Sequence, residues 1–226
     1  MKIQAALKES NNFLMKNNIR NSQLDSEILM SEVIGKDRKY IILNSNKTLK
    51  KKEILKFKRL IEQRSKGKPI AYLTNKKFFW KYEFAVSDQI LIPRPDTELI
   101  VDQVLKMTRN KFKLKFLDIG IGSGCILLSI LKERPHFHGV GIDISKKCIN
   151  ISKKNAHKLK VENRVKFFKT DVDNFVRGKY DLIISNPPYI KKFDLKYLER
   201  DVVDFEPKQA LDGGIDGVSE IRKVIK

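Results

Sequence analysis

An amide side chain, two prolines and an aromatic ring follow a short apolar run in the stretch LIISNPPY, residues 182–189. Proline has no backbone N–H, so two in series end a strand or a helix. The pattern therefore predicts a buried strand that stops at Asn186 and presents Asn186 and Tyr189 at its C-terminal end. A plain Asn-Pro-Pro turn without a function is the alternative interpretation.

These residue types suit chemistry at the nitrogen of a planar amide or an aromatic amine, which is a poor nucleophile. The side-chain oxygen of Asn186 and the carbonyl of Pro187 can each accept one N–H of such a group, and Tyr189 can stack on its plane. Two acceptors in this arrangement orient the nitrogen and favour its pyramidal form in the transition state. Catalysis would then be mainly positioning for an in-line displacement, without a strict need for a base.

The glycine-rich stretch LDIGIGSGC is a second candidate site. Gly120, Gly122 and Gly124 allow a tight turn from strand to helix and a close approach of a ligand to the backbone. Cys125 stands where a dinucleotide-binding G-x-G-x-x-G sequence has its third glycine, and Asp118 adds negative charge beside the loop. Both features favour a cationic ligand without phosphates, such as S-adenosylmethionine. A tight turn that binds nothing remains the alternative.

Two further aspartates are candidate contacts of the same ligand. Asp143 follows the glycine loop by roughly twenty residues, where an acidic side chain can accept both ribose hydroxyls. Asp171 ends the next predicted strand and can accept an adenine amino group, while Val172 offers an N–H and an apolar surface to the ring. The alternative for each aspartate is a helix N-cap or a turn residue.

Short apolar runs that alternate with helix-compatible segments predict the element carrying these residues. The runs are KFLDIG, HGVGIDIS, RVKFFKTDV and YDLIISN, and the helical segments cover 125–134, 146–158 and a shorter piece near Asn174. Such alternation predicts an α/β fold with a doubly wound, mostly parallel sheet covered on both faces. Ligands of such sheets bind at the carboxyl ends of the strands. The residues predicted at that edge are Asp118, Asp143, Asp171 and Asn186.

The first third of the chain has the spacing of amphipathic helices. Helices are predicted around residues 3–14, 24–33 and 49–64, the second capped by Asn21 or Ser22 and ended by Gly35. Aromatic and β-branched residues then alternate with polar ones over 65–95, which predicts a β-hairpin between two domains. The predicted boundaries are a helical domain at 1–74, a hairpin linker at 75–93 and a ligand-binding domain at 94–226.

Composition limits the functional classes. The chain has 226 residues, 41% hydrophobic and 33% charged, which is typical of a folded globular protein. The N-terminus lacks an apolar targeting segment and no stretch is long enough to span a membrane, so we expect the cytoplasm. Two cysteines imply no disulfide framework, and the histidines and cysteines have no metal-ligand spacing, so no metal is expected.

The formal net charge of +20 has two interpretations. It can mark an electrostatic surface for RNA or a ribosomal partner. It can also reflect a compositional bias in which lysines solvate exposed faces. The lysines are scattered without a dominant block, which favours the second interpretation. We therefore do not expect a required nucleic acid partner.

The glycine loop followed by NPPY resembles class I S-adenosylmethionine-dependent amino-group methyltransferases, a Rossmann-like group with DNA adenine, RNA and protein-glutamine enzymes. The stretches RSKGKPIAYL (64–73), LIPRPDTELIV (91–101) and ALDGGIDGVSEIRKVI (210–225) resemble the peptide chain release factor glutamine methyltransferase family. The resemblance implies catalytic roles for Asn186, Pro187 and Tyr189. The implied cofactor contacts are Gly120, Ile121, Gly122, Ser123, Gly124, Asp143, Asp171, Val172 and Asn186. The implied contacts of the target glutamine are Asn186, Pro187, Pro188 and Tyr189.

The same resemblance implies methyl transfer to the Gly-Gly-Gln loop of a bacterial-type release factor, by a monomeric enzyme whose helical domain helps to dock the substrate. The family continues beyond the DGG segment with another helix and the last strands, so we expect a C-terminally incomplete sheet, with four strands where the fold has seven. Two alternatives remain open. One is a DNA or RNA amino-group methyltransferase, and the other is an inactive truncated remnant that binds RNA or the ribosome.

Overall fold

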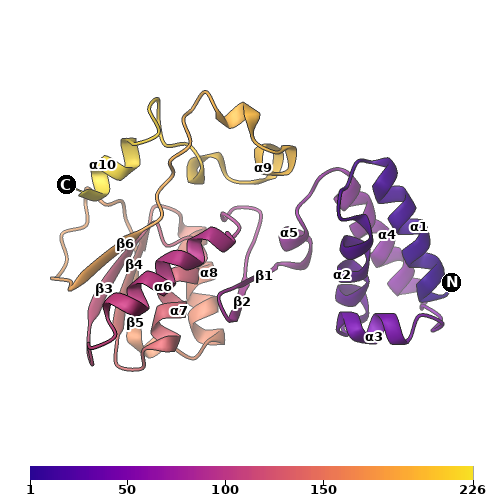
Figure 1. Ribbon diagram of the computed structural model, residues 1–226, viewed down its shortest axis with the longest axis horizontal. Helices are drawn as coiled ribbons and strands as arrows, with labels where there is room; N and C mark the ends of the chain where they lie inside the picture. The colour runs from indigo at the N-terminus through magenta and orange to yellow at the C-terminus, as the bar shows by residue number, and fades with distance from the viewer. Residues whose placement is uncertain (226) are drawn as a thin grey trace. The chain divides into compact units, whose positions relative to one another are not determined.

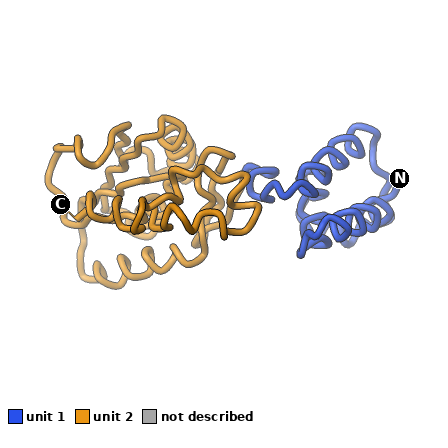
Figure 2. The backbone as a smooth tube through the Cα atoms, turned by 90° about the horizontal axis from the view of Figure 1, so that it is seen from above, with its two compact units in different colours: residues 1–75 blue, residues 76–226 orange. Residues whose placement is uncertain are grey.

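The chain divides into two structural units, Met1–Asn75 and Lys76–Lys226, which Figure 2 colours separately. The structure is a computed structural model that describes residues 1–225. Lys226, the last residue of the predicted ligand-binding domain, lies outside this range. Across residues 1–225, no helix is both long and apolar enough to cross a membrane.

The first unit is helical, as predicted (Figure 1). Its helices are α1 (Ile3–Lys16), α2 (Ser22–Ile34), α3 (Arg38–Leu43), α4 (Lys51–Ser65) and α5 (Ile70–Thr74). Helices α1, α2 and α4 are the three predicted from apolar spacing, and α2 ends at Gly35 in the left-handed conformation. The hydrophobic core of the first unit is formed by Ile3, Ala6, Leu14, Leu29, Met30, Ile41, Leu49, Phe57, Ile61 and Leu73.

Two short helices of the first unit were not predicted. α3 has six residues and α5 has five, which is too short for a helical repeat of apolar positions to be recognised. The prediction of a hairpin over the whole of 65–95 was therefore wrong at its start, where α5 lies. Ala71, Tyr72 and Leu73, which lie in this stretch, are buried residues of α5.

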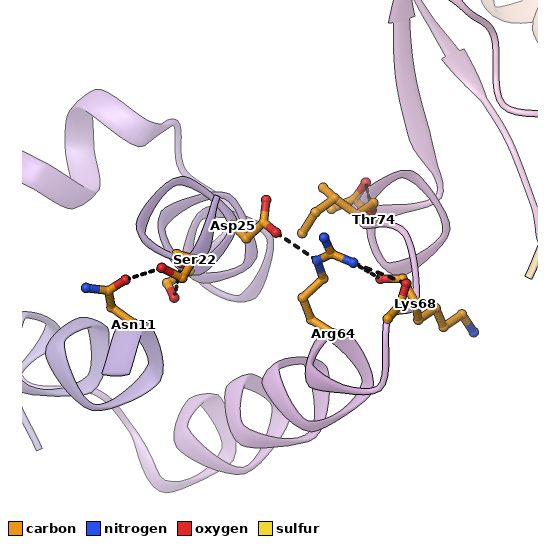
Figure 3. Close-up of polar contacts among 9 residues, drawn as sticks. Asn11, Ser22, Asp25, Arg64, Lys68 and Thr74 are labelled. Carbon is orange, nitrogen blue, oxygen red and sulfur yellow. Dashed lines mark hydrogen bonds and ion pairs between the residues drawn. The ribbon is translucent and has the colours of Figure 1, made fainter. Parts of the chain in front are cut away.

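A nearly buried ion pair joins α2 to the end of α4 (Figure 3). The Nε of Arg64 donates to Oδ2 of Asp25 at 2.7 Å, and the two side chains are 14% and 8% exposed. Nη1 of Arg64 also donates to the carbonyls of Gly67 and Lys68, both at 3.2 Å. One guanidinium thus ties two helices to the loop that follows α4.

We predict that Arg64→Ala destabilises the first unit by about 3 kcal/mol, because the buried carboxyl of Asp25 loses its ion-pair partner. Hydrogen exchange of the α2 and α4 amides in the full chain measures this opening free energy for the unit by itself. Arg59→Ala is the matched control, since Arg59 lies exposed on the same helix. Equal protection in the two variants would contradict the structural role of Arg64.

The second unit begins with the predicted hairpin, formed by β1 (Lys76–Phe79) and β2 (Tyr82–Ala85). Hydrogen bonds connect the hairpin to Glu98 and Glu133, which lie in the two α-helices that follow it in the chain. Trp80 donates its backbone N–H to Glu98 at 2.7 Å and its ring N–H to Glu133 at 3.0 Å. The hydroxyl of Tyr82 donates to the same oxygen of Glu133 at 3.0 Å.

A parallel sheet follows, as the strand–helix alternation predicted. Its strands are β3 (Lys115–Ile119), β4 (His138–Asp143), β5 (Val165–Lys169) and β6 (Leu182–Ser185), in the order β5-β4-β3-β6. The helices of this unit are α6 (Glu98–Met107), α7 (Cys125–Glu133), α8 (Lys146–Lys158), α9 (Arg200–Phe205) and α10 (Ser219–Ile225). Side chains of α6, α7 and α8 pack on one face of the sheet, and Val224 of α10 packs on the other.

The predicted short helix near Asn174 is absent from the described chain. The carboxylate of Asp171 instead accepts the backbone N–H of Asn174 at 2.8 Å, which forms a single turn. Beyond it, Phe175 and Tyr180 pack against the sheet without regular secondary structure. A side chain that satisfies the backbone locally competes with helix formation.

The strand order places the two candidate sites next to each other. The chain builds β3, β4 and β5 outward and then returns to add β6 on the other side of β3. Ile119 at the end of β3 pairs with Ser185 at the end of β6, and the Ser185 hydroxyl donates to the Ile119 carbonyl at 2.9 Å. The loops after β3 and β6 therefore leave the sheet at its topological switch point, where open α/β sheets bind ligands.

Candidate active site

The glycine loop turns from β3 into α7 through left-handed backbone conformations. Gly120, Gly122 and Gly124 have φ of 75°, 56° and 81°. The N–H groups of Gly120 and Ile121 both donate to the carbonyl of Ile142 in β4, at 3.0 Å. A Cβ built on Gly120 or Gly122 would meet no atom within 4 Å. The loop thus leaves open space above its backbone, as a bound ligand requires.

Two buried polar side chains of α8 fix this loop. The hydroxyl of Ser152 donates to the carbonyl of Gly122 at 3.0 Å, and the amide of Asn155 donates to the carbonyl of Ser123 at 2.8 Å. Asn155 also pairs with both backbone groups of Ala85 at the end of β2, at 2.8 and 3.0 Å. The sequence analysis missed both residues. Their signal is two small polar side chains on the apolar face of a predicted helix.

Asp118, predicted to add negative charge beside the loop, is more deeply buried than an edge position implies. It lies within β3, is 1% exposed, and neither carboxylate oxygen has a hydrogen-bond partner in the described chain. Burial raises the pKa of this carboxyl to about 8. The backbone N–H of Leu127 partly opposes this increase, and the nearby charge of Asp143 raises the pKa further. An unpaired buried carboxyl is a group that a cationic ligand can satisfy.

Asp143 ends β4 and faces the glycine loop. Its Oδ2 accepts the N–H of Gly122 at 3.0 Å, and its Oδ1 accepts the N–H of Ser145 at 2.8 Å. Burial raises the pKa of Asp143, although these two backbone donors oppose the shift. The helix-cap form of the alternative is wrong for Asp143, because the side chain that caps α8 is Ser145, whereas its turn form is present in the hydrogen bond from the Ser145 N–H. Each carboxylate oxygen retains a lone pair for a further donor.

Asp171 and Val172 lie farther out. Asp171 comes two residues after β5 and is exposed, and both of its oxygens accept from the side-chain amide of Asn174 at 2.9 Å. These hydrogen bonds lower the pKa of Asp171. Val172 packs against the sheet face that contains Leu117 and Val140. The turn role proposed as the alternative for Asp171 is thus present in the structure, and its contact with a ligand remains a prediction.

The NPPY loop begins where β6 ends. Nδ2 of Asn186 donates to the hydroxyl of Thr97 at 3.3 Å, and Oδ1 of Asn186 accepts no hydrogen bond from the described residues. Pro187 and Pro188 are half-buried, whereas Tyr189 is 65% exposed. The loop therefore offers a free amide oxygen and an accessible aromatic ring, the two groups that the sequence analysis assigned to a planar substrate.

The glycine-rich segment 211–217 packs against the NPPY loop and is hydrogen-bonded to the residue that follows this loop. The N–H of Ile190 donates to the carbonyl of Leu211 at 3.1 Å, and the N–H of Gly213 donates back to the carbonyl of Ile190 at 2.8 Å. A Cβ on Gly213 would lie 2.9 Å from the carbonyl of Pro188 and 2.8 Å from Cα of Tyr189. The stretch 210–225 was quoted only for its resemblance, and this contact explains why a residue without a side chain stands there.

A buried acidic residue links two segments near the site. Glu206 follows α9, and its side chain is 1% exposed. It forms an ion pair with Arg94 and accepts the backbone N–H of Ile92 at 3.2 Å. The segment before Thr97 is thereby tied to the segment that follows the NPPY loop.

Asp118 makes the stability of the ligand-free protein depend on pH. The native state keeps its proton up to about pH 8, whereas an unfolded aspartate loses it near pH 4. The native state thus binds more protons between these values, so this group's contribution to stability falls as pH rises. We predict that Asp118→Asn removes this component from a thermal-unfolding series between about pH 5 and about pH 8. The exposed Asp173→Asn is the control, and an Asp118→Asn slope parallel to the unmodified chain would refute the assignment.

Comparison with known proteins covers nearly the whole chain. Residues 5–74 match the PrmC N-terminal domain family and residues 96–203 match the methyltransferase small domain family. The structure is also similar to the hMettl16 catalytic domain, solved with the MAT2A 3'UTR hairpin 6, with a TM-score of 0.52 over 63% of this chain and 54% of that one. At 16% identity this similarity shows a shared fold only.

Curated relatives named release factor glutamine methyltransferase are similar to the chain over most of its length. The protein from Geobacter sulfurreducens is 35% identical over 99% of this chain and 78% of its own length. That from Buchnera aphidicola subsp. Baizongia pistaciae is 38% identical over 100% and 80%, and that from Clostridium acetobutylicum is 39% identical over 99% and 80%. The chain therefore belongs to the release factor glutamine methyltransferase family.

Proposed function

We propose that this chain transfers a methyl group from S-adenosylmethionine to the side-chain amide nitrogen of the glutamine in the Gly-Gly-Gln loop of peptide chain release factors. One observation carries the proposal. The NPPY loop, with its free amide oxygen, leaves β6 directly beside the end of β3, where the open glycine loop begins. An acceptor for a substrate amide and a cradle for a cationic cofactor thus lie on adjacent strands.

The residues around the glycine loop fit the proposed cofactor. S-adenosylmethionine, when bound, supplies an electrophilic methyl group on a positively charged sulfur. Asp118 provides the unpaired buried carboxyl, and Gly120 and Gly122 leave the backbone open to a ligand. Asp143 has lone pairs left for ribose hydroxyls. We assign the remaining contacts, Ile121, Ser123, Gly124, Asp171 and Val172, by their places on the same edge of the sheet.

The NPPY residues would orient the glutamine. Oδ1 of Asn186 and the carbonyl of Pro187 accept the two N–H groups of the amide and favour its pyramidal form as the new bond forms. Tyr189 covers the planar amide, and Pro188 keeps the loop rigid. The thiols of Cys125 and Cys148 take no part, because burial raises the pKa of each to about 12 and keeps both protonated.

The direct test is methylation of a purified release factor by the full chain. We expect a mass gain of one methyl group on the peptide that contains the Gly-Gly-Gln loop, and none on a release factor whose target glutamine is alanine. Adenine-containing DNA and RNA oligonucleotides are tested in parallel. Methylation of an oligonucleotide but not of the release factor would support the nucleic acid alternative and contradict the proposal.

A pair of variants separates the two halves of the site. Asn186→Ala should lower kcat about a hundredfold with little effect on cofactor affinity, because the acceptor acts on the substrate in the transition state. Asp143→Ala should weaken cofactor binding by roughly 1.5–3 kcal/mol, measured by calorimetry, because it removes a charged acceptor. Asn163→Ala, an exposed asparagine of the same unit, is the control. If Asn186→Ala lost cofactor affinity as strongly as turnover, the residue would be a structural turn.

A further inference from the structure

The amide group of an asparagine has two nearly identical edges, and only one of them suits this reaction. The oxygen edge accepts an N–H of the target, whereas the NH2 edge would face that N–H with a second donor. Asn186 acts only if something holds its plane and engages its nitrogen on the side away from the substrate. No residue of the NPPY loop does so in the described structure.

Thr97 is the residue in contact with that nitrogen. Its hydroxyl accepts from Nδ2 of Asn186 at 3.3 Å, and this is the hydrogen bond that the Asn186 side chain makes among the described residues. Both residues are half-buried. With Nδ2 engaged by Thr97, Oδ1 is the edge left for a substrate.

Thr97 is itself held in place from several directions. It ends the 3-10 turn Pro95–Thr97, where the ring of Pro95 fixes the backbone and the N–H of Thr97 donates to the carbonyl of Arg94 at 3.1 Å. Arg94 in turn forms the ion pair with buried Glu206. The branched side chain of threonine also restricts its own rotation. The hydroxyl is therefore presented from a rigid support.

We infer that Thr97 is a positioning residue for methyl transfer, which orients the amide of Asn186 so that its oxygen faces the target nitrogen. The inference rests on the proposed function of the NPPY loop, and it assigns a role in the reaction to Thr97 of the segment IPRPDTE. Thr97 acts through Asn186, without touching the reacting atoms. Its removal should therefore affect turnover and leave the binding of both substrates intact.

The test compares Thr97→Val, which keeps the shape and removes the hydroxyl, with Thr97→Ser, which keeps the hydroxyl. We expect Thr97→Val to lower kcat about tenfold, the effect of one hydrogen bond, with unchanged KM for the release factor and unchanged cofactor affinity. Thr97→Ser should stay within about threefold of the unmodified chain. Asp96→Ala, at the exposed neighbouring position, is the control.

A spectroscopic measurement tests the contact independently of activity. The side-chain NH2 resonances of Asn186, identified by their loss in Asn186→Ala, should shift in Thr97→Val and stay in place in Thr97→Ser. This readout applies even if the release factor proves not to be the substrate, so the two hypotheses can fail separately. Unchanged resonances in Thr97→Val, or equal kcat losses in the valine and serine variants, would overturn the inference.

Discussion

The arrangement of the second unit depends on the hydrogen bonds of one fully buried side-chain amide, that of Asn155. It accepts the N–H of Ala85 and donates to the carbonyls of Ala85 and Ser123, so it satisfies backbone groups of the hairpin end and of the glycine loop together. Water does not reach these groups, and each one left unpaired would cost about 1–3 kcal/mol. The hairpin, the loop and α8 therefore have one relative placement, and the open side of the glycine loop follows from it.

Further contacts connect the segments around the switch point to one another. Pairing of β3 with β6 brings the glycine and NPPY loops together, Gly213 supports the NPPY loop from behind, and Glu206 returns the chain to Arg94. A site held by so many contacts suits the proposed reaction. No group in it is needed as a base, so the rate depends on holding a poor nucleophile in line with the methyl group. Small displacements then cost a large part of the activity.

The electrostatics of the site are opposite to those of the whole chain. The net charge is +20, yet two carboxyls lie beside the glycine loop on neighbouring strands, the buried Asp118 and the half-buried Asp143. A bound cation would favour the ionised form of these carboxyls and interact strongly with it where burial excludes water, whereas exposed lysines are screened by solvent and salt. Overall composition thus says little about the ligand, and the two carboxyls beside the glycine loop say more.

Sequence patterns alone determined the alternation of strands and helices, the three longer helices of the first unit and the positions of the glycine and NPPY loops, because each depends on the local spacing of apolar residues, glycines and prolines. They could not give α3 and α5, which are too short for apolar periodicity to be recognised, or the turn at Asp171, where a side chain replaced the expected helix. Tertiary structure alone decided that Thr97 contacts Asn186, that Asn155 and Ser152 hold the glycine loop, and that Asp118 is buried without a partner. These contacts join residues far apart in the chain, and the order and register of the strands, which no local pattern encodes, bring them together.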